Sequence, residues 1–292
     1  MYLEAKNPRQ IALLQEFITI QQPSRITVQL DLPVNQSTLL AIAKNDLWPH
    51  AINPQNIITE GEGAKIARAA TILSDLVRLQ PDKKFLDYGC GQGHVPAEAA
   101  RRGNHATGYD PTPQKWEQYT NKINLTNDLD MVHQNAPYDI ILCYDVLDYM
   151  PDGQVQVLQN IHDLLAPDGY AYIHCHPYTS AHGAGLYTTL NLAYAHLVLE
   201  PEDIRSLGGN IGDSARIIKP IDSYQKWIQE AGFRVNREVI HRTTPPAMFN
   251  DPGIVDFLIN RLYGPNDGYV KNAETLYSIL SIDHVNYDLA HH

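Results

Sequence analysis

The residues Phe85-Leu-Asp-Tyr-Gly-Cys-Gly-Gln-Gly-His94 decide the fold of this chain. Phe85 to Tyr88 opens with apolar residues and ends at a glycine turn, which predicts a buried parallel strand. Gly89, Gly91 and Gly93 alternate in that turn. Glycine adopts a positive φ at little cost and leaves room for a ligand close to the backbone. The stretch therefore predicts a strand followed by a ligand-binding turn.

A predicted helix completes the pattern. Val95 to Arg102 contains Pro96 in its first turn and is followed by Gly103, two residue types typical of a helix start and a helix end. The unpaired N–H groups of the first helical turn then face the glycine turn. Strand, turn and helix in this order are typical of a nucleotide-binding domain.

Two carboxylates narrow the choice of ligand. Asp87 ends the first strand and is placed to hold an ammonium group directly or through water. Asp110 follows the next hydrophobic segment, 23 residues later (110 − 87), where a carboxylate can accept both hydroxyls of a ribose. Dinucleotide enzymes carry G-x-G-x-x-G, whereas here His94 takes the place of the last glycine. A nucleoside ligand is favoured, and a dinucleotide oxidoreductase is the alternative enzyme.

With these residues the chain resembles the class I S-adenosylmethionine-dependent methyltransferases. Asp87 and the alternating glycines match the family's first motif, and Asp110 matches its ribose-binding acid. Three further segments follow in the family's order, within a resemblance that covers roughly 64–242: Tyr138–Met150, Leu164–Tyr170 and Tyr224–Phe233. The resemblance implies a doubly wound α/β fold with a mostly parallel seven-stranded sheet, the last strand antiparallel. It also implies S-adenosylmethionine as cofactor and S-adenosylhomocysteine as product.

The resemblance also implies which residues bind the cofactor. At the third strand tip the family usually has an acid that receives the adenine amino group, and Asn135 aligns with it. Its amide oxygen can still accept that hydrogen bond. The residues expected at the cofactor are Asp87, Gly89, Cys90, Gly91, Gly93, Asp110, Asn135 and Tyr144.

The rest of the chain suggests an accessory part. We expect 1–62 to be an N-terminal segment that caps the site, contacts another subunit or supports the fold. Residues 63–292 are expected to form the methyltransferase-like domain, with an insertion at 178–220. Within it, Leu186–Leu199 predicts a helix between glycine-rich flanks, either a lid that shapes the acceptor pocket or a packing helix.

Histidines gather after the predicted fifth strand. His176 and His182, together with Asp145, are expected to face the acceptor, since histidine titrates near neutral pH and suits a general base for O-methylation. His174, His176 and His182 with a carboxylate also fit a metal site, and ordinary packing is a third reading. The sequence leaves these roles open, and no metal is predicted.

The net charge and the fourth strand tip limit the kinds of acceptor that the sequence supports. A net charge of -11 argues against a broad surface for duplex nucleic acid. The fourth strand tip, Cys143-Tyr144-Asp145-Val146, lacks both the Asn/Asp-Pro-Pro-aromatic tetrapeptide of DNA amino-methyltransferases and the Pro-Cys of cytosine methyltransferases. A small-molecule acceptor is favoured. A regulatory cofactor-binding protein, or transfer of a group other than methyl, remains an alternative.

No apolar run approaches the roughly 18 residues of a membrane helix, and the first residues lack a secretory pattern, so a cytoplasmic location is expected. The three cysteines show no C-x-x-C spacing and are expected to be buried thiols. The sequence does not decide the oligomeric state.

Overall fold

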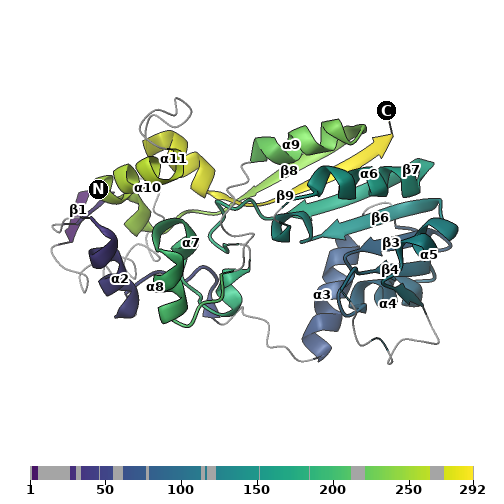
Figure 1. Cartoon of the computed structure of the whole chain (residues 1–292), viewed down its shortest axis with the longest axis horizontal. Helices are drawn as coiled ribbons and strands as arrows, with labels where there is room; N and C mark the ends of the chain where they lie inside the picture. The colour runs from purple at the N-terminus through teal and green to yellow at the C-terminus, as the bar shows by residue number, and fades with distance from the viewer. Residues whose placement is uncertain are drawn as a thin grey trace. The chain divides into compact units, whose positions relative to one another are not determined.

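The computed structural model describes residues 2–5, 27–30, 34–45, 47–54, 62–76, 79–112, 116, 123–150, 152–183, 185–211, 221–263 and 273–291 (Figure 1). By its contacts the chain forms two compact units. Unit 1 comprises 1–57, 176–220 and 240–284, and unit 2 comprises 58–175, 221–239 and 285–292. Unit 1 is therefore built from three stretches of chain. The division into 1–62 and 63–292 stays a prediction.

A seven-stranded sheet in the order β5-β4-β3-β6-β7-β9-β8 is the centre of the fold. The strand pairs β5-β4, β4-β3, β3-β6 and β6-β7 are parallel, and β9 runs antiparallel to β7. The sheet confirms the predicted α/β class, its mostly parallel strands and its antiparallel last strand. The strands are β3 (Lys84–Tyr88), β4 (His105–Tyr109), β5 (Asn124–Thr126), β6 (Tyr138–Tyr144), β7 (Leu165–Cys175), β8 (Phe233–Arg242) and β9 (Ile282–His291).

Helices cover both faces of this sheet. The apolar side of α3 (Glu62–Asp75) packs with α4 (His94–Arg101) over β3 and β6, and Ile72, Leu73 and Phe85 share one buried cluster. In Figure 1, α6 (Gln154–Leu164) and α9 (Ile221–Glu230) lie on the other face. This two-sided cover explains why β3 is buried after its first residue, as the sequence predicts.

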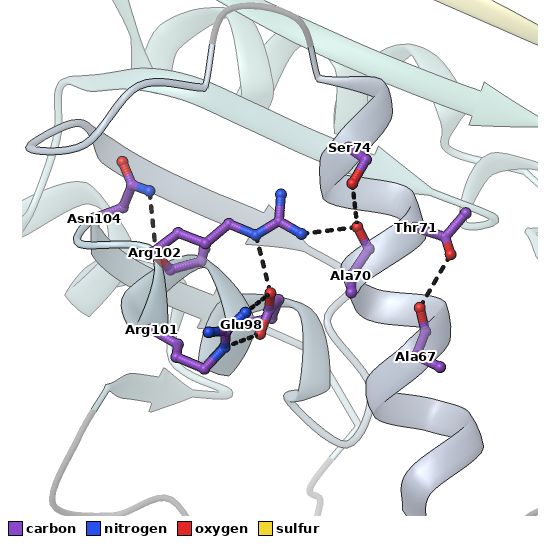
Figure 2. A network of polar contacts seen from close by, with 9 residues as sticks. Ala67, Ala70, Thr71, Ser74, Glu98, Arg101, Arg102 and Asn104 are labelled. Carbon is purple, nitrogen blue, oxygen red and sulfur yellow. Dashed lines mark hydrogen bonds and ion pairs between the residues drawn. The ribbon is translucent and has the colours of Figure 1, made fainter.

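A polar network joins α4 to α3 (Figure 2). Glu98 is only 5% exposed, and its carboxylate accepts hydrogen bonds from the Arg101 Nε at 2.6 Å and the Arg102 Nε at 2.9 Å. Arg102 also donates to the Ala70 carbonyl oxygen in α3 at 2.9 Å. The hydrogen bond from Arg101 lowers the pKa of Glu98, and Arg102 adds to it, although burial acts in the opposite direction. The network fixes the helix that begins at the glycine turn.

The third strand lies earlier than the sequence suggested. With Asn135 at its tip, the third strand would lie directly before that residue, at Asp130–His133, but β5 ends at Thr126 and α5 (Leu129–Gln134) follows. The Asp128 side chain accepts a hydrogen bond from the backbone N–H of Asp130 and so caps the helix. The capping Asp128 favours a helix here more strongly than the short apolar pattern after it favours a strand.

Unit 1 has its own apolar core. It contains the small parallel pair β1 (Tyr2–Ala5) and β2 (Thr27–Leu30). The N-terminal segment packs on the insertion: the Trp48 indole donates a hydrogen bond to the Ala193 carbonyl oxygen at 2.7 Å. The helices of this unit are α2 (Gln36–Lys44), α7 (Ala195–Val198), α8 (Pro201–Ser206), α10 (Pro252–Tyr263) and α11 (Ala273–Leu280).

The predicted helix over Leu186–Leu199 is wrong. The segment has a 3-10 turn, Leu186–Thr188, and then the one-turn α7. Tyr194 has a φ of 56° between them, which is a left-handed conformation that a continuous helix excludes. Two further 3-10 turns are Leu147–Tyr149 and Ala247–Asn250. None of the described helices has the length and apolar character required to cross a bilayer.

Candidate active site

The glycine turn after β3 adopts the conformation that its sequence predicts. Gly89, Gly91 and Gly93 have φ values of 93°, 50° and 84°. The backbone N–H groups of Gly89 and Cys90 both donate to the Tyr109 carbonyl oxygen, at 2.7 and 2.9 Å. We call residues 89–93 the cofactor loop. Its geometry ties the end of β3 to the end of β4.

Asp110 points at the cofactor loop. Its Oδ2 accepts a hydrogen bond from the Gly91 N–H at 2.9 Å, and its Oδ1 accepts one from the Thr112 N–H at 2.9 Å. Each carboxylate oxygen can accept more than one hydrogen bond, so the group can also receive ribose hydroxyls. The acid lies at the tip of the neighbouring parallel strand, as the spacing predicts.

Trp116 is a residue that sequence reasoning missed. Its indole Nε1 donates to the Gly91 carbonyl oxygen at 2.8 Å. Gly91 is thus held at its N–H by Asp110 and at its carbonyl by Trp116. No motif marks this tryptophan, and its closeness to the loop depends on the path of the chain after β4.

Asp87 is deeply buried below the cofactor loop. It is 4% exposed, and burial together with the nearby charge of Asp110 raises the pKa of its carboxyl to about 8. A cation beside it would favour the ionised form. The neighbouring thiol of Cys90 is also buried, and burial with the charges of Asp87 and Asp110 raises its pKa. The raised pKa disfavours its thiolate, the form that reacts.

A cavity of about 260 Å³ opens beside the loop. One wall is α3, through Lys65, Arg68, Ala69 and Ile72, which sequence analysis did not assign to the site. The opposite wall comes from the loop and the start of α4, and Tyr144 and Asp87 also line the cavity. The side chains of Lys65 and Gln92 join across it at 2.7 Å.

A compact polar group lies at the ends of β6 and β7. His174 is 4% exposed, and its Nδ1 lies 2.7 Å from Asp145 Oδ1. Arg68 binds the other oxygen of the same carboxylate at 2.9 Å. The Tyr144 ring stacks on His174 with centroids 3.8 Å apart. Since a carboxylate only accepts, the His174 Nδ1 carries a proton, and in the neutral form of the ring Nε2 carries the lone pair.

The prediction for Asn135 is wrong. Asn135 follows α5 and precedes β6, and its carbonyl oxygen accepts a hydrogen bond from Lys84, the first residue of β3. It therefore lies at the amino ends of the parallel strands, the edge opposite Asp87 and Asp110. The misplaced third strand caused this error. The tip of the observed strand carries Asn127 and Asp128.

His176 and His182 lie in unit 1, where they meet residues from the start of β9. His176 Nδ1 is 2.9 Å from the Asp283 carbonyl oxygen, and His182 Nε2 is 3.3 Å from Asp283 Oδ1. Within unit 2, Asp145 is paired with His174. The assignment of His176, His182 and Asp145 to catalysis stays a prediction.

These features define a class of protein. A mostly parallel sheet with this strand order, a glycine turn after its first strand along the chain and an acid at the next strand tip are the features of a nucleoside-binding α/β domain. Residues 63–238, more than half of the chain, match the family model for a methyltransferase domain, and the chain belongs to that family. The resemblance to class I methyltransferases is confirmed.

Individual relatives match a shorter region than the family model does. Ubiquinone biosynthesis O-methyltransferases from Xylella fastidiosa and Haemophilus ducreyi are 32% identical over 101 residues and 33% identical over 105 residues. These matches cover 31% of this chain and only 40% and 44% of the relatives' own length.

Solved structures of low sequence identity also overlap with the chain. Magnesium protoporphyrin IX methyltransferase from Synechocystis PCC 6803 is 16% identical, with 79% of this chain and 82% of that chain covered and a TM-score of 0.43. A cyclopropane synthase from Mycobacterium tuberculosis is 18% identical, with 83% and 88% covered and a TM-score of 0.45. The strand order of the sheet, rather than these overlaps, defines the fold.

Proposed function

We propose that this protein is an S-adenosylmethionine-dependent methyltransferase. The observation that carries the proposal is Gly91, which is fixed by Asp110 and Trp116 and has no atom within 4 Å of the position where a Cβ would project. A bare backbone beside a sugar-binding acid suits a nucleoside. When bound, S-adenosylmethionine supplies a methyl group on a sulfonium, and S-adenosylhomocysteine is the product.

The residues of this chain would bind and align that cofactor. Asp87 is proposed to hold the amino group, the cofactor loop with Gly89, Cys90 and Gly93 to pack against the nucleoside, and Asp110 to accept the ribose hydroxyls. Tyr144 lines the cavity beside the loop. For the adenine amino group we now propose Asp128 or Asn127, since the Asp110 N–H donates to the Thr126 carbonyl oxygen next to them in sequence.

The proposed acceptor is a small molecule that is methylated on oxygen. The partial match to O-methyltransferases supports this choice. A hydroxyl must lose its proton during transfer, and His174, oriented by Asp145, is the proposed base because its Nε2 carries a lone pair. The predictions that duplex nucleic acid is not a partner and that the protein is cytoplasmic stay predictions.

Calorimetry with S-adenosylhomocysteine tests cofactor binding. We expect saturable binding with one ligand per chain and weaker binding of NAD. Tighter binding of NAD would favour a dinucleotide enzyme. Cofactor binding without a methylated product, across a broad panel of hydroxylated acceptors, would instead favour a regulatory protein.

A variant of His174 tests the proposed base. His174→Asn keeps a donor near Asp145 but removes the Nε2 lone pair, so kcat should fall by roughly 10²- to 10⁴-fold while the affinity for S-adenosylhomocysteine stays unchanged. His105→Gln, at an exposed histidine in the same unit, is the control. An unchanged kcat in His174→Asn would remove His174 from the mechanism.

A further inference from the structure

Three histidines and one aspartate form a cluster in unit 1 that the proposed methyl transfer does not use. We call His176, His182, Asp283 and His284 the histidine cluster. They come from three places in the sequence: His176 directly follows β7, His182 lies in the loop after it, and Asp283 and His284 lie at the start of β9. Nothing in the chain's motifs brings these residues together.

One carboxylate organises the cluster. Asp283 Oδ1 lies 3.3 Å from His182 Nε2, and its Oδ2 lies 2.8 Å from His284 Nδ1. The rings of His176 and His182 have centroids 4.7 Å apart, and those of His176 and His284 are 5.7 Å apart. A single negative charge balances only one imidazolium, so three protonated rings at this spacing would repel one another.

The tautomer of His176 is set by its partner. Its Nδ1 lies 2.9 Å from the Asp283 carbonyl oxygen, which only accepts, so Nδ1 carries the proton. In the neutral ring the lone pair then resides on Nε2, and this is the form that binds a metal. Metal-binding histidines characteristically donate their other ring N–H to a carbonyl or a carboxylate, which fixes the ring orientation.

We propose that the histidine cluster binds a divalent first-row transition-metal ion of the Zn²⁺ type. Imidazole nitrogens with one carboxylate oxygen are the donor set that such ions prefer over Mg²⁺ or Ca²⁺. The ion would take the place of the protons that now link Asp283 to His182 and His284. This inference does not depend on the proposed function.

The spacing of the donor atoms fits such an ion. One donor atom each from His176, Asp283 and His284 lies within 4.8 Å of the other two. In a tetrahedral site with bonds of about 2.0 Å, neighbouring donors are roughly 3.3 Å apart. His182 Nε2 and Asp283 Oδ1 already have a separation of 3.3 Å.

A bound ion would tie together three segments of unit 1. The His241 ring, from the last residues of β8, stacks on His284 with centroids 4.1 Å apart and an interplanar angle of 16°. It would support a ligand without being one. Because an unfolded chain does not hold these groups together, metal binding should raise the stability of the folded protein.

Metal binding is tested on protein of residues 1–292 without an added tag, after treatment with chelator and dialysis. We expect Zn²⁺ titration in a calorimeter to give one saturable site per chain and a rise in Tm that chelator reverses, whereas Mg²⁺ does neither. Co²⁺ should give the intense visible absorption of a tetrahedral site. Absence of a saturable site, or a weak octahedral Co²⁺ spectrum, would overturn the proposal.

Variants then locate the ion. Asp283→Asn and His284→Gln should each weaken Zn²⁺ binding by roughly 100-fold or more. Two controls should keep wild-type affinity: His50→Gln, an exposed histidine of the same unit that contacts the Asn191 carbonyl oxygen, and His291→Gln near the C-terminus. Equal losses in the controls and the cluster variants would mean that scattered surface histidines bind the ion. Circular dichroism confirms that each variant is folded, and the Co²⁺ spectrum of the wild type tests the site if a variant is not.

Discussion

The cofactor loop and the histidine cluster are built in opposite ways. The loop is continuous in sequence, and its contacts with Asp110 and Trp116 span only 19 and 25 residues. In the cluster, the contact between His176 and Asp283 spans 107 residues. The loop presents mainly backbone, whereas the cluster presents side chains. A site made of backbone is sensitive to any added atom, and a site made of side chains depends on each donor.

The two regions also treat charge differently. Burial and the nearby charge of Asp110 raise the pKa of Asp87 next to the loop, so that region is suited to a cation or to hydroxyl donors. In the cluster the Asp283 carboxylate contacts two imidazole rings, and a bound cation would replace the protons between them. If this contrast holds, substitutions that change the shape of the loop should weaken ligand binding more than substitutions that change its charge.

Gly89→Ala should have the largest effect on the loop. Gly89 has a φ of 93°, and an added Cβ would overlap the Val146 side chain. Strain and overlap together should cost about 3 kcal/mol, which corresponds to roughly 100-fold in S-adenosylhomocysteine affinity. Calorimetry measures the affinity, and thermal unfolding measures the stability.

Gly63→Ala is the matched control for this change. Gly63 lies in the first turn of α3 and has no atom within 4 Å of an added Cβ. Alanine there should leave the affinity unchanged and raise the unfolding free energy by about 0.5 to 1 kcal/mol. Equal affinities in the two alanine variants would show that the loop does not contact the cofactor.

Asp110→Asn comes next in size. It keeps the shape of the side chain but removes the charge and one acceptor, so S-adenosylhomocysteine should bind about 10- to 100-fold more weakly. Asp163→Asn, whose side chain is 72% exposed, should leave the affinity unchanged. An unaltered affinity in Asp110→Asn would exclude the ribose-binding role.

The contrast between the two regions explains what the sequence could predict. The strand, the glycine turn and the acid at the next strand tip follow local rules, so Asp87, the glycines and Asp110 were placed correctly in the fold. Asn135 was misplaced because a three-residue strand carries too little pattern to compete with a capped helix. Asp283 and His284 were not assigned to any site, since only the antiparallel insertion of β9 brings them beside the residues that follow β7.

The pH dependence of cofactor binding tests the role of Asp87. Its pKa is raised to about 8, so near neutral pH the carboxyl must release a proton before it can pair with the ligand's ammonium group. Affinity for S-adenosylhomocysteine should therefore rise roughly tenfold from about pH 6.5 to about pH 7.5 and level off above about pH 8. Calorimetry in buffers of different ionisation enthalpy should detect release of nearly one proton.

The raised pKa of Asp87 has the opposite effect on the stability of the free protein, which falls as the pH rises. Between the ordinary pKa of 3.8 and about 8, the folded carboxyl holds a proton that the unfolded chain has released. The unfolding free energy contributed by Asp87 should therefore fall as the pH rises through this window. Asp87→Asn should remove both dependences. A pH-independent affinity in the wild type would show that Asp87 is already ionised or is not paired with the ligand.

Glu98→Gln should give the smallest effect and tests how local the loop's support is. Glu98 binds Arg101 and Arg102 on its own helix, and Gln keeps one acceptor but loses the charge. The unfolding free energy should fall by about 1 kcal/mol, because both arginines retain access to solvent.

The pair of Glu202 with Arg205 in unit 1 is the control: its carboxylate is 79% exposed, so Glu202→Gln should lower the unfolding free energy by less than about 0.5 kcal/mol. Since the loop is held mainly by Asp110 and Trp116, Glu98→Gln should change cofactor affinity by less than about threefold. A loss as large as that of Asp110→Asn would mean that the position of α4, and not the loop alone, determines how the cofactor binds.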